Sequence, residues 1–161
     1  MPGTINSPIV VVDTNVLLSA LLFRGKPSRL HALWKSRRVT PKANRFIIRE
    51  YARVLTYDKF KLTVEEISTI LNEEILPYFI IVKPESKDIP HIPKDPDDIH
   101  FLQAAIDGDA DYLISGDAHL LNLNGKYRFS IITPAEFLDK FNEYRLAACL
   151  CGNLNTIRDI G

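Results

Sequence analysis

Short runs of consecutive apolar residues alternate along the chain with longer stretches whose apolar residues recur every three or four positions. An uninterrupted apolar run predicts a strand buried on both faces, whereas the longer period predicts a helix with one apolar face. Strands are therefore expected at residues 9–12, 38–40, 79–82, 112–115 and 131–132. Helices are expected at residues 16–22, 28–36, 47–55, 63–75, 96–107, 118–121 and from 134 onward.

This alternation predicts an α/β fold with three layers, in which helices cover both faces of a mainly parallel central sheet of four or five strands. Three local expectations accompany it. Ser28 is expected to cap the second helix, and Pro41 to open the connection to the third. The run 79–82 is expected to form a buried strand.

The chain has 161 residues, of which 46% are hydrophobic and 25% charged, and this balance is typical of one globular domain. We expect that domain over residues 1–145 and assign no structure to the tail 146–161. Lys and Arg together number 20, as do Asp and Glu, so the net charge is zero and any binding of nucleic acid has to be local. Cys149 and Cys151 are expected to be free thiols.

Localisation is also constrained by the pattern of apolar residues. No apolar stretch has the length needed to cross a bilayer, and residues 1–8 lack the charged and apolar halves of a signal peptide. We therefore expect a cytoplasmic protein without a membrane partner.

Two of the expected buried strands are followed within two residues by an acidic residue. Asp13 follows the strand 9–12, and Asp117 follows the strand 112–115 after one glycine. In open α/β sheets ligands bind just outside the carboxyl ends of the strands, so both acids stand where a reactive group or a metal is expected. The alternative for Asp13 is a helix cap, and for Asp117 an ordinary turn.

Two further acids fall on or beside the apolar faces of helices. Glu50 lies at the margin of the apolar stripe of helix 47–55, while Arg49 and Arg53 point elsewhere. Asp98 precedes Phe101 by three residues and so begins the stripe of its helix. Solvent exposure at the edge of the stripe is the alternative for Glu50, and favourable placement at a helix start is the alternative for Asp98.

All four carboxylates are expected at positions that face the sheet or its crevice. The structural alternatives given for each acid separately do not predict this common placement. Brought together, the carboxylates would repel one another and could not all stay ionised without a multivalent cation. Hard oxygen ligands suit Mg²⁺ or Mn²⁺, which also bind the oxygens of substrate phosphates.

The motifs around these acids resemble those of PIN domains, over about residues 8–142. They are Asp-Thr-Asn at 13–15, Glu-Tyr-Ala-Arg-Val-Leu at 50–55, Asp-Pro-Asp-Asp at 95–98 and Tyr-Leu-Ile-Ser-Gly-Asp at 112–117. The sequence is most similar to small prokaryotic PIN proteins described as toxins of toxin–antitoxin systems, of the VapC type. Residues that match this subgroup also follow the first helix and precede the last; they are Arg24, Gly25, Pro27, Ser28, Thr133 and Pro134.

The resemblance implies an endoribonuclease that depends on Mg²⁺ or Mn²⁺ and hydrolyses phosphodiester bonds of single-stranded or structured RNA. It implies that the metal ligands and catalytic residues are Asp13, Glu50, Asp98 and Asp117. Thr14, Asn15 and Ser115, which adjoin the acids, would orient the carboxylates or a water. A homodimer and an inhibitory antitoxin protein are also expected from the resemblance.

Substrate contacts are expected from basic residues after the first helix. Arg24, Lys26 and Arg29 are candidates for binding RNA phosphates, with solvated surface as the alternative. The histidines share no metal-ligand spacing and are expected to have ordinary surface or helix-face roles; they are His31, His91, His100 and His119.

Two other functions compete with the nuclease. A haloacid-dehalogenase-type phosphatase also has an Asp after its first strand, but it needs a second Asp at the position of Asn15 and an acid at the position of Leu121. A non-catalytic PIN-like module that binds RNA or protein has the same fold. Loss of acids would favour that module, whereas this chain has all four.

Overall fold

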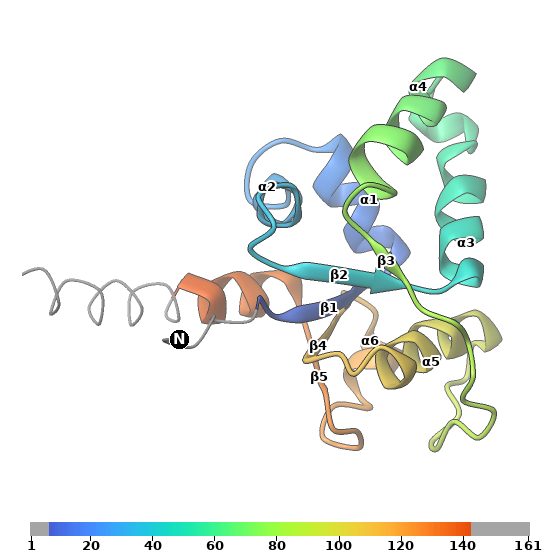
Figure 1. Cartoon of the computed structure of the whole chain (residues 1–161), viewed down its shortest axis with the longest axis vertical. Coiled ribbons are helices and arrows are strands. Elements are labelled where there is room, and N and C mark those ends of the chain that lie inside the picture. Colours follow the sequence, from blue (N-terminus) through green and yellow to red (C-terminus); the bar gives the residue numbers. More distant parts are fainter. Residues whose placement is uncertain (1–6, 143–161) are drawn as a thin grey trace, which may run out of the picture.

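The computed structural model describes residues 7–142 and contains a five-stranded parallel sheet with the strand order β3-β2-β1-β4-β5. The strands are β1 (Ile9–Val12), β2 (Thr40–Ala43), β3 (Ile80–Ile81), β4 (Tyr112–Ile114) and β5 (Ser130–Ile132). Helices lie on both faces of the sheet (Figure 1). The predicted three-layer α/β/α fold is therefore confirmed, and every strand pair in it is parallel.

The helices follow the strands in the alternating order that the sequence predicts. They are α1 (Thr14–Leu22), α2 (Ser28–Lys35), α3 (Arg45–Leu55), α4 (Val64–Thr69), α5 (Ile99–Asp107) and α6 (Ala118–Leu121). A π-helical segment, η2 (Ile70–Ile75), continues α4, and 3-10 turns occur at η1 (Asp58–Phe60) and η3 (Pro96–Asp98). Residues 134–142 are also helical.

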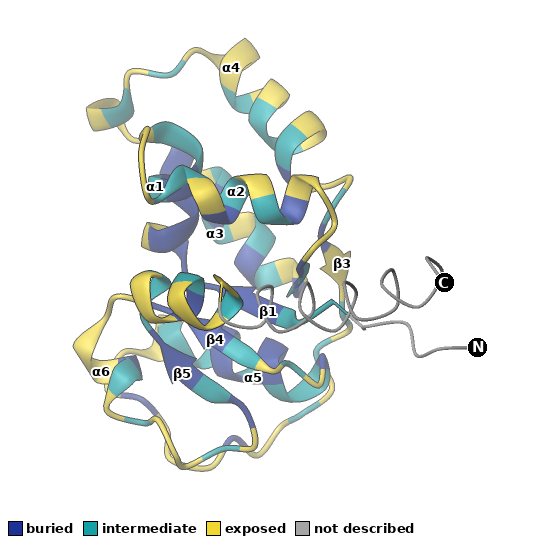
Figure 2. Cartoon of the chain, turned by 90° about the vertical axis from the view of Figure 1, so that its left-hand side faces the viewer, coloured by how far each residue is buried: buried dark blue, intermediate teal, exposed yellow. Residues whose placement is uncertain are grey.

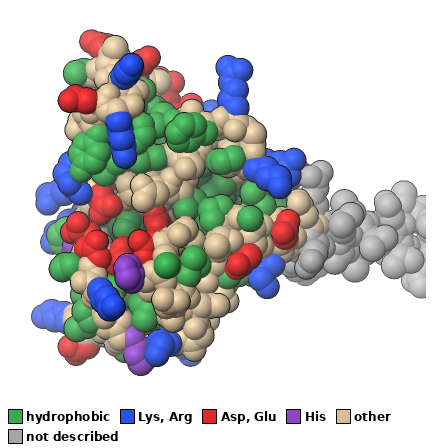
Figure 3. Space-filling view, turned by 180° about the vertical axis from the view of Figure 1, so that it is seen from behind, with side chains coloured by type: hydrophobic (Ala, Val, Ile, Leu, Met, Phe, Trp, Pro, Cys, Tyr) green, Lys and Arg blue, Asp and Glu red, His purple; other side chains and the backbone are tan. Residues whose placement is uncertain are grey.

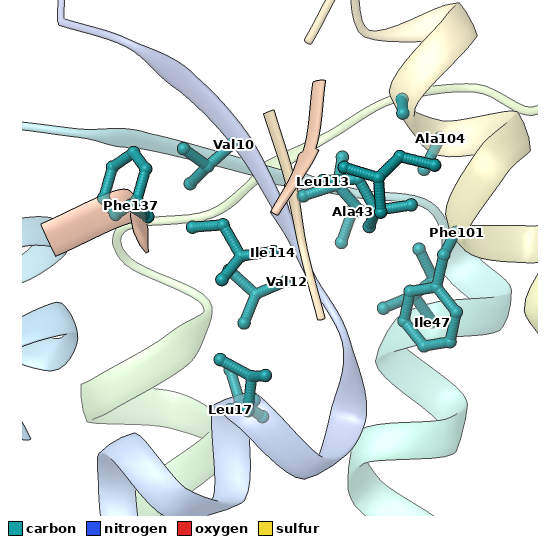
Figure 4. Packing of buried hydrophobic residues seen from close by; sticks show 14 of the residues in the cluster. Val10, Val12, Leu17, Ala43, Ile47, Phe101, Ala104, Leu113, Ile114 and Phe137 are labelled. Carbon is teal, nitrogen blue, oxygen red and sulfur yellow. The ribbon is translucent and has the colours of Figure 1, made fainter. Parts of the chain in front are cut away.

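The core forms where β1 passes between the two helical layers. Val10, Val11 and Val12 have no exposed surface, which is what a central strand with both faces covered requires. Figure 4 shows Val12 and Ile114 beside Leu17 of α1, and Figure 2 shows the buried central strands between exposed outer helix faces. Burial of this β-branched run holds the carboxyl ends of β1 and β4 at one edge, since Val12 is paired with Ile114.

Pro41 lies inside β2 and does not open a connection, so this expectation was wrong and the strand begins two residues later than expected. The amide of Thr40 donates to the carbonyl of Pro8, on the side of β1. Alternate residues direct their amides to opposite sides, so the nitrogen of Pro41 faces the β3 side. Pairing with β3 begins only at Lys42, and the missing N–H therefore breaks no bond of the sheet.

Two other local expectations were also wrong. The strand β3 is a sheet edge, and the side chains of Ile80 and Ile81 are each 49% exposed rather than buried. Its apolar composition does not distinguish an edge from a centre, because strand order depends on long-range pairing. Ser28 does not cap α2: Pro27 is the cap residue, and the Ser28 hydroxyl donates to the carbonyl of Gly25.

The tail 146–161, with Cys149 and Cys151, lies outside the described residues. Within residues 7–142, no helix combines the length and the apolar character that a membrane crossing requires.

Candidate active site

Asp13 and Asp117 are joined through one serine at the carboxyl ends of the neighbouring strands β1 and β4. The Ser115 hydroxyl donates to Asp13 Oδ2 over 2.5 Å and accepts from the Asp117 amide over 3.0 Å. The Asp13 amide also donates to the carbonyl of Ile114, at 3.0 Å. Parallel pairing of the two strands thus fixes the spacing between the two acidic segments.

Asp13 is almost completely buried, and both of its carboxylate oxygens accept hydrogen bonds. Only 6% of its surface is exposed, and its Oδ1 accepts from the amide of Asn15 at 2.7 Å, which caps α1. Burial raises the pKa of this carboxyl, the hydrogen bonds from Ser115, Asn15 and Val16 oppose that rise, and the charge of Asp117 adds to it. The sequence offered either a helix cap or a position at the ligand crevice for Asp13. In the structure Asp13 caps α1 and also lines the cavity at the strand ends.

Glu50 reaches the same region from α3. The hydroxyl of Thr14 donates to Glu50 Oε1 over 2.5 Å, which connects this carboxylate to the residue after Asp13. The phenol of the next residue, Tyr51, donates to the carbonyl of Val12. Two successive side chains of α3 therefore bind on either side of Asp13, and Glu50 is half-buried rather than freely solvated.

Asp98 stands at the junction of η3 and α5, where the chain begins its apolar helix face. Burial raises the pKa of Asp98 from 3.8 to about 6, with further contributions from the charges of Asp117, Asp95, Asp13 and Glu50 in that order. Burial is thus the main cause of the raised pKa of Asp98, and the charges of the other three acids add to it. Figure 3 shows acidic side chains gathered on this face.

Replacing Asp98 by Asn is expected to stabilise the metal-free protein at neutral pH. The folded-state pKa is about 6 against 3.8, so ionisation of Asp98 costs folding free energy that appears as the pH rises through this interval. Allowing for solvent screening, Asp98→Asn should raise the free energy of unfolding by about 1 kcal/mol at pH 7 and by close to nothing at pH 4.

Urea denaturation in the presence of a chelator at both pH values measures this difference. Asp97→Asn is the matched control, because Asp97 occupies the same helix start but is exposed, so both variants lose the same favourable interaction with the helix dipole. Equal effects of the two substitutions at pH 7 would show that Asp98 carries no special repulsion.

The donor set fits a hard divalent cation in its chemistry and its charge. None of the four carboxylates has a salt-bridge partner within residues 7–142, so no direct ion pair neutralises their negative charge. Carboxylate oxygens are the ligands that Mg²⁺ and Mn²⁺ prefer. In the same part of the chain, however, no three Asp, Glu, His or Cys side chains converge as a preformed metal centre.

A cavity of about 660 Å³ opens beside Asp13 and Asp117. Lys26 and Arg29 line it, together with apolar residues of α1, α2 and the helical segment 134–142. These two basic side chains thus share a cavity with the acids, as their predicted contact with substrate requires. Arg24 is exposed but does not line this cavity.

Sequence reasoning missed the residues that join α3 and α5 around the acids. Asn44 caps α3 through its side-chain oxygen, and its amide donates to the carbonyl of His100 at 3.2 Å. Tyr51, predicted only as an apolar position, donates to the strand that ends at Asp13. An Asn directly before the helix was a visible signal of the cap, whereas no pattern in the sequence indicated the Tyr51 contact.

The comparison with protein families agrees with this geometry. The PIN domain family model matches residues 9–119, which is more than half of the chain and contains all four acids. The chain therefore belongs to the PIN domain family. PIN domains are generally nucleases that use divalent metal ions. No curated protein matches the chain.

Proposed function

We propose that the protein is a metal-dependent endoribonuclease whose centre is formed by Asp13, Glu50, Asp98 and Asp117. One observation carries the proposal: in a PIN domain, Asp13 and Asp117 follow the paired strands β1 and β4, and Glu50 accepts from Thr14, the residue next to Asp13. Within residues 7–142 no salt bridge neutralises these acids or Asp98. Because hydrolysis of a phosphodiester requires neutralisation of phosphate charge, such a cluster suits that reaction once a cation is bound.

Mg²⁺ or Mn²⁺ held by these carboxylates would supply Lewis acidity toward a phosphate oxygen and would favour ionisation of a water. The residues of the chain have separate tasks. Asp13, the most buried acid, is fixed by Ser115 and by the amide of Asn15. Thr14 holds Glu50 in the same way. Such fixed carboxylates need little reorganisation on binding.

The remaining contacts suit an anionic substrate. Lys26 and Arg29 line the same cavity as Asp13 and Asp117 and can bind phosphates on one side of the cleaved bond. The Asn15 side chain is exposed beside Asp13 and can hydrogen-bond a water or a substrate oxygen. Arg24, which is also exposed, is proposed only as a peripheral contact.

Cleavage of RNA should depend completely on a divalent cation. Purified protein with Mn²⁺ or Mg²⁺ is expected to cut a labelled single-stranded RNA, and excess chelator is expected to reduce the rate to that of buffer alone. Addition of Mn²⁺ beyond the chelator should restore cleavage. Undiminished cleavage in chelator would contradict the proposal, and RNA binding without cleavage in metal would favour the non-catalytic module.

We further propose that the protein is the toxin of a toxin–antitoxin pair, acting in the cytoplasm as a homodimer that an antitoxin protein inhibits. The support is the similarity of its motifs to VapC-type proteins. Expression of the wild-type chain should arrest growth. The proposal also requires a small reading frame adjacent to its gene, whose co-expression should relieve the arrest. Growth unaffected by the wild-type chain would contradict the toxin role and would leave the nuclease chemistry to the cleavage assay.

A further inference from the structure

Three arginines follow one another at four-residue intervals along the exposed side of α3. They are Arg45, Arg49 and Arg53, called here the arginine row, and the side chain of each is exposed. Residues four apart lie one above the other on a helix. The row therefore forms a line of positive charge along a protein whose net charge is zero.

The arginine row has no acidic partner. Within residues 7–142, no carboxylate lies within salt-bridge distance of any of its guanidinium groups. The contacts of the row are aromatic instead: Arg45 lies 4.9 Å from the centre of the Phe46 ring, and Arg53 donates to the hydroxyl of Tyr57 at 2.8 Å. Planar guanidinium groups that are free of carboxylates are well suited to phosphates.

The row borders the candidate active site. Arg49 and Arg53 line a groove of about 360 Å³ together with Glu50, one of the four acids, and with Asp97 and His100. This groove and the cavity that contains Lys26 and Arg29 share no lining residue. Figure 3 shows basic side chains at the edge of the molecule next to the acidic cluster.

An aromatic surface completes the groove. The rings of Phe46 and His100 are stacked, with centroids 4.4 Å apart and an angle of 17° between their planes. Both residues line the groove, and Arg45 lies over the Phe46 ring. The groove itself holds two arginines and two carboxylates, so the positive charge lies along its α3 rim, where Arg45 extends the row beyond the groove. Cations that follow one another beside aromatic rings are the usual arrangement for binding a single nucleic-acid strand, because phosphates meet the cations and bases stack on the rings.

We propose that the arginine row and the His100 ring bind single-stranded RNA on the α3 side of the cleaved bond. The arginines contact successive backbone phosphates, and one base stacks against His100. This inference rests on the proposed ribonuclease function. It adds a surface that binds the RNA strand, which the four acids alone do not provide. A cluster of four carboxylates repels a polyanion, so a neighbouring cationic surface has to supply the attraction.

The test compares two triple variants with the same change in charge, each in an Asp13→Asn background that binds without cutting. One replaces Arg45, Arg49 and Arg53 by Ala. The control replaces Arg37, Arg38 and Arg128, which are exposed and precede the amino ends of β2 and β5, whereas the four acids lie toward the carboxyl ends of the strands. Fluorescence anisotropy with a short labelled single-stranded RNA gives the affinity at several salt concentrations.

Loss of three phosphate contacts should lower the slope of log K against log salt by about 2, since each contact on a single strand contributes about 0.7. Affinity at low salt should fall at least tenfold in the row variant and remain near that of the parent in the control. Equal affinities and slopes for the row variant and the control would overturn the inference.

The stacking component has its own test. In the Asp13→Asn background, His100→Ala should weaken RNA binding about tenfold, whereas His100→Phe keeps a ring and should bind nearly as tightly as the parent. If the Phe and Ala variants bind equally weakly, a base does not stack at His100.

The two proposals can fail separately. Suppose that the Asp13→Asn protein binds RNA through the arginine row while wild-type protein with Mn²⁺ cuts nothing. The nuclease proposal then fails, and the proposed RNA binding by the arginine row is supported. If wild-type protein cuts RNA and the row variant, with Asp13 intact, cuts subsaturating RNA as fast as the control, the proposed RNA binding by the arginine row is wrong and the nuclease proposal stands. Loss of the arginine row should raise KM rather than lower kcat.

Discussion

Asp13→Asn is expected to reduce metal-dependent cleavage of RNA by at least about 100-fold, because the substitution removes the charge of the most central acid and keeps its shape. Asp13 is the most buried of the four carboxylates and contacts Ser115, whose hydroxyl also binds the Asp117 amide. The amide oxygen of Asn can still accept from the backbone of Asn15, so the cap of α1 should survive.

Initial rates with saturating Mn²⁺ measure this loss, and a thermal denaturation curve checks that the variant is folded. Asp88→Asn is the matched control, since Asp88 is an exposed acid on the loop before α5 and does not line the cavity beside Asp13. An Asp13→Asn protein that is folded and as active as the Asp88→Asn protein would remove Asp13 from the proposed centre.

Trp34→Ala is expected to destabilise the fold by about 3–5 kcal/mol, which is a large part of the stability of a domain of this size. Trp34 has no exposed surface, packs edge-on against Phe79 at 5.6 Å, and donates to the carbonyl of Glu74 at 3.0 Å. Its loss leaves a cavity between α2, the start of β3 and the π-helical segment η2, and an unpaired carbonyl at Glu74.

Urea denaturation at neutral pH measures the change in the free energy of unfolding. Trp34→Phe retains most of the apolar surface but loses the donor, so it should cost about 1–2 kcal/mol. Ser36→Ala, at an exposed position two residues further on, should change the midpoint little. A midpoint for Trp34→Ala equal to that of the wild type would show that this contact does not stabilise the domain.

Local patterns predicted those parts of the fold whose structure depends on near neighbours. The strand at residues 9–12 is confirmed, and the helix expected from residue 63 has Thr63 as its cap, with Glu66 completing a capping box. Pro41 and the exposed strand β3 were misjudged because both depend on which strand lies alongside. Strand order arises from contacts between distant segments, and no local period encodes it.

The candidate site was predictable only in its parts. Strand ends indicated Asp13 and Asp117, a helix start indicated Asp98, and the margin of an apolar stripe indicated Glu50. Only the fold shows that α3 brings Glu50 to Thr14, beside Asp13. The roles of the four acids as metal ligands stay predictions. The serine between Asp13 and Asp117 was expected to orient carboxylates, and it contacts Asp13 directly. Arg49 and Arg53 were predicted to point away from the apolar stripe of their helix. That prediction did not indicate that they line a groove together with Glu50.

The four carboxylates are proposed to bind a divalent cation as one unit. Equilibrium binding of Mn²⁺, followed by the loss of its free electron paramagnetic resonance signal, tests this claim most directly. Wild-type protein at pH 7 should bind Mn²⁺ stoichiometrically, and Asp13→Asn and Asp98→Asn should each weaken binding at least tenfold, with Asp88→Asn unchanged. Equal Mn²⁺ binding by all four proteins, or none by the wild type, would contradict the account.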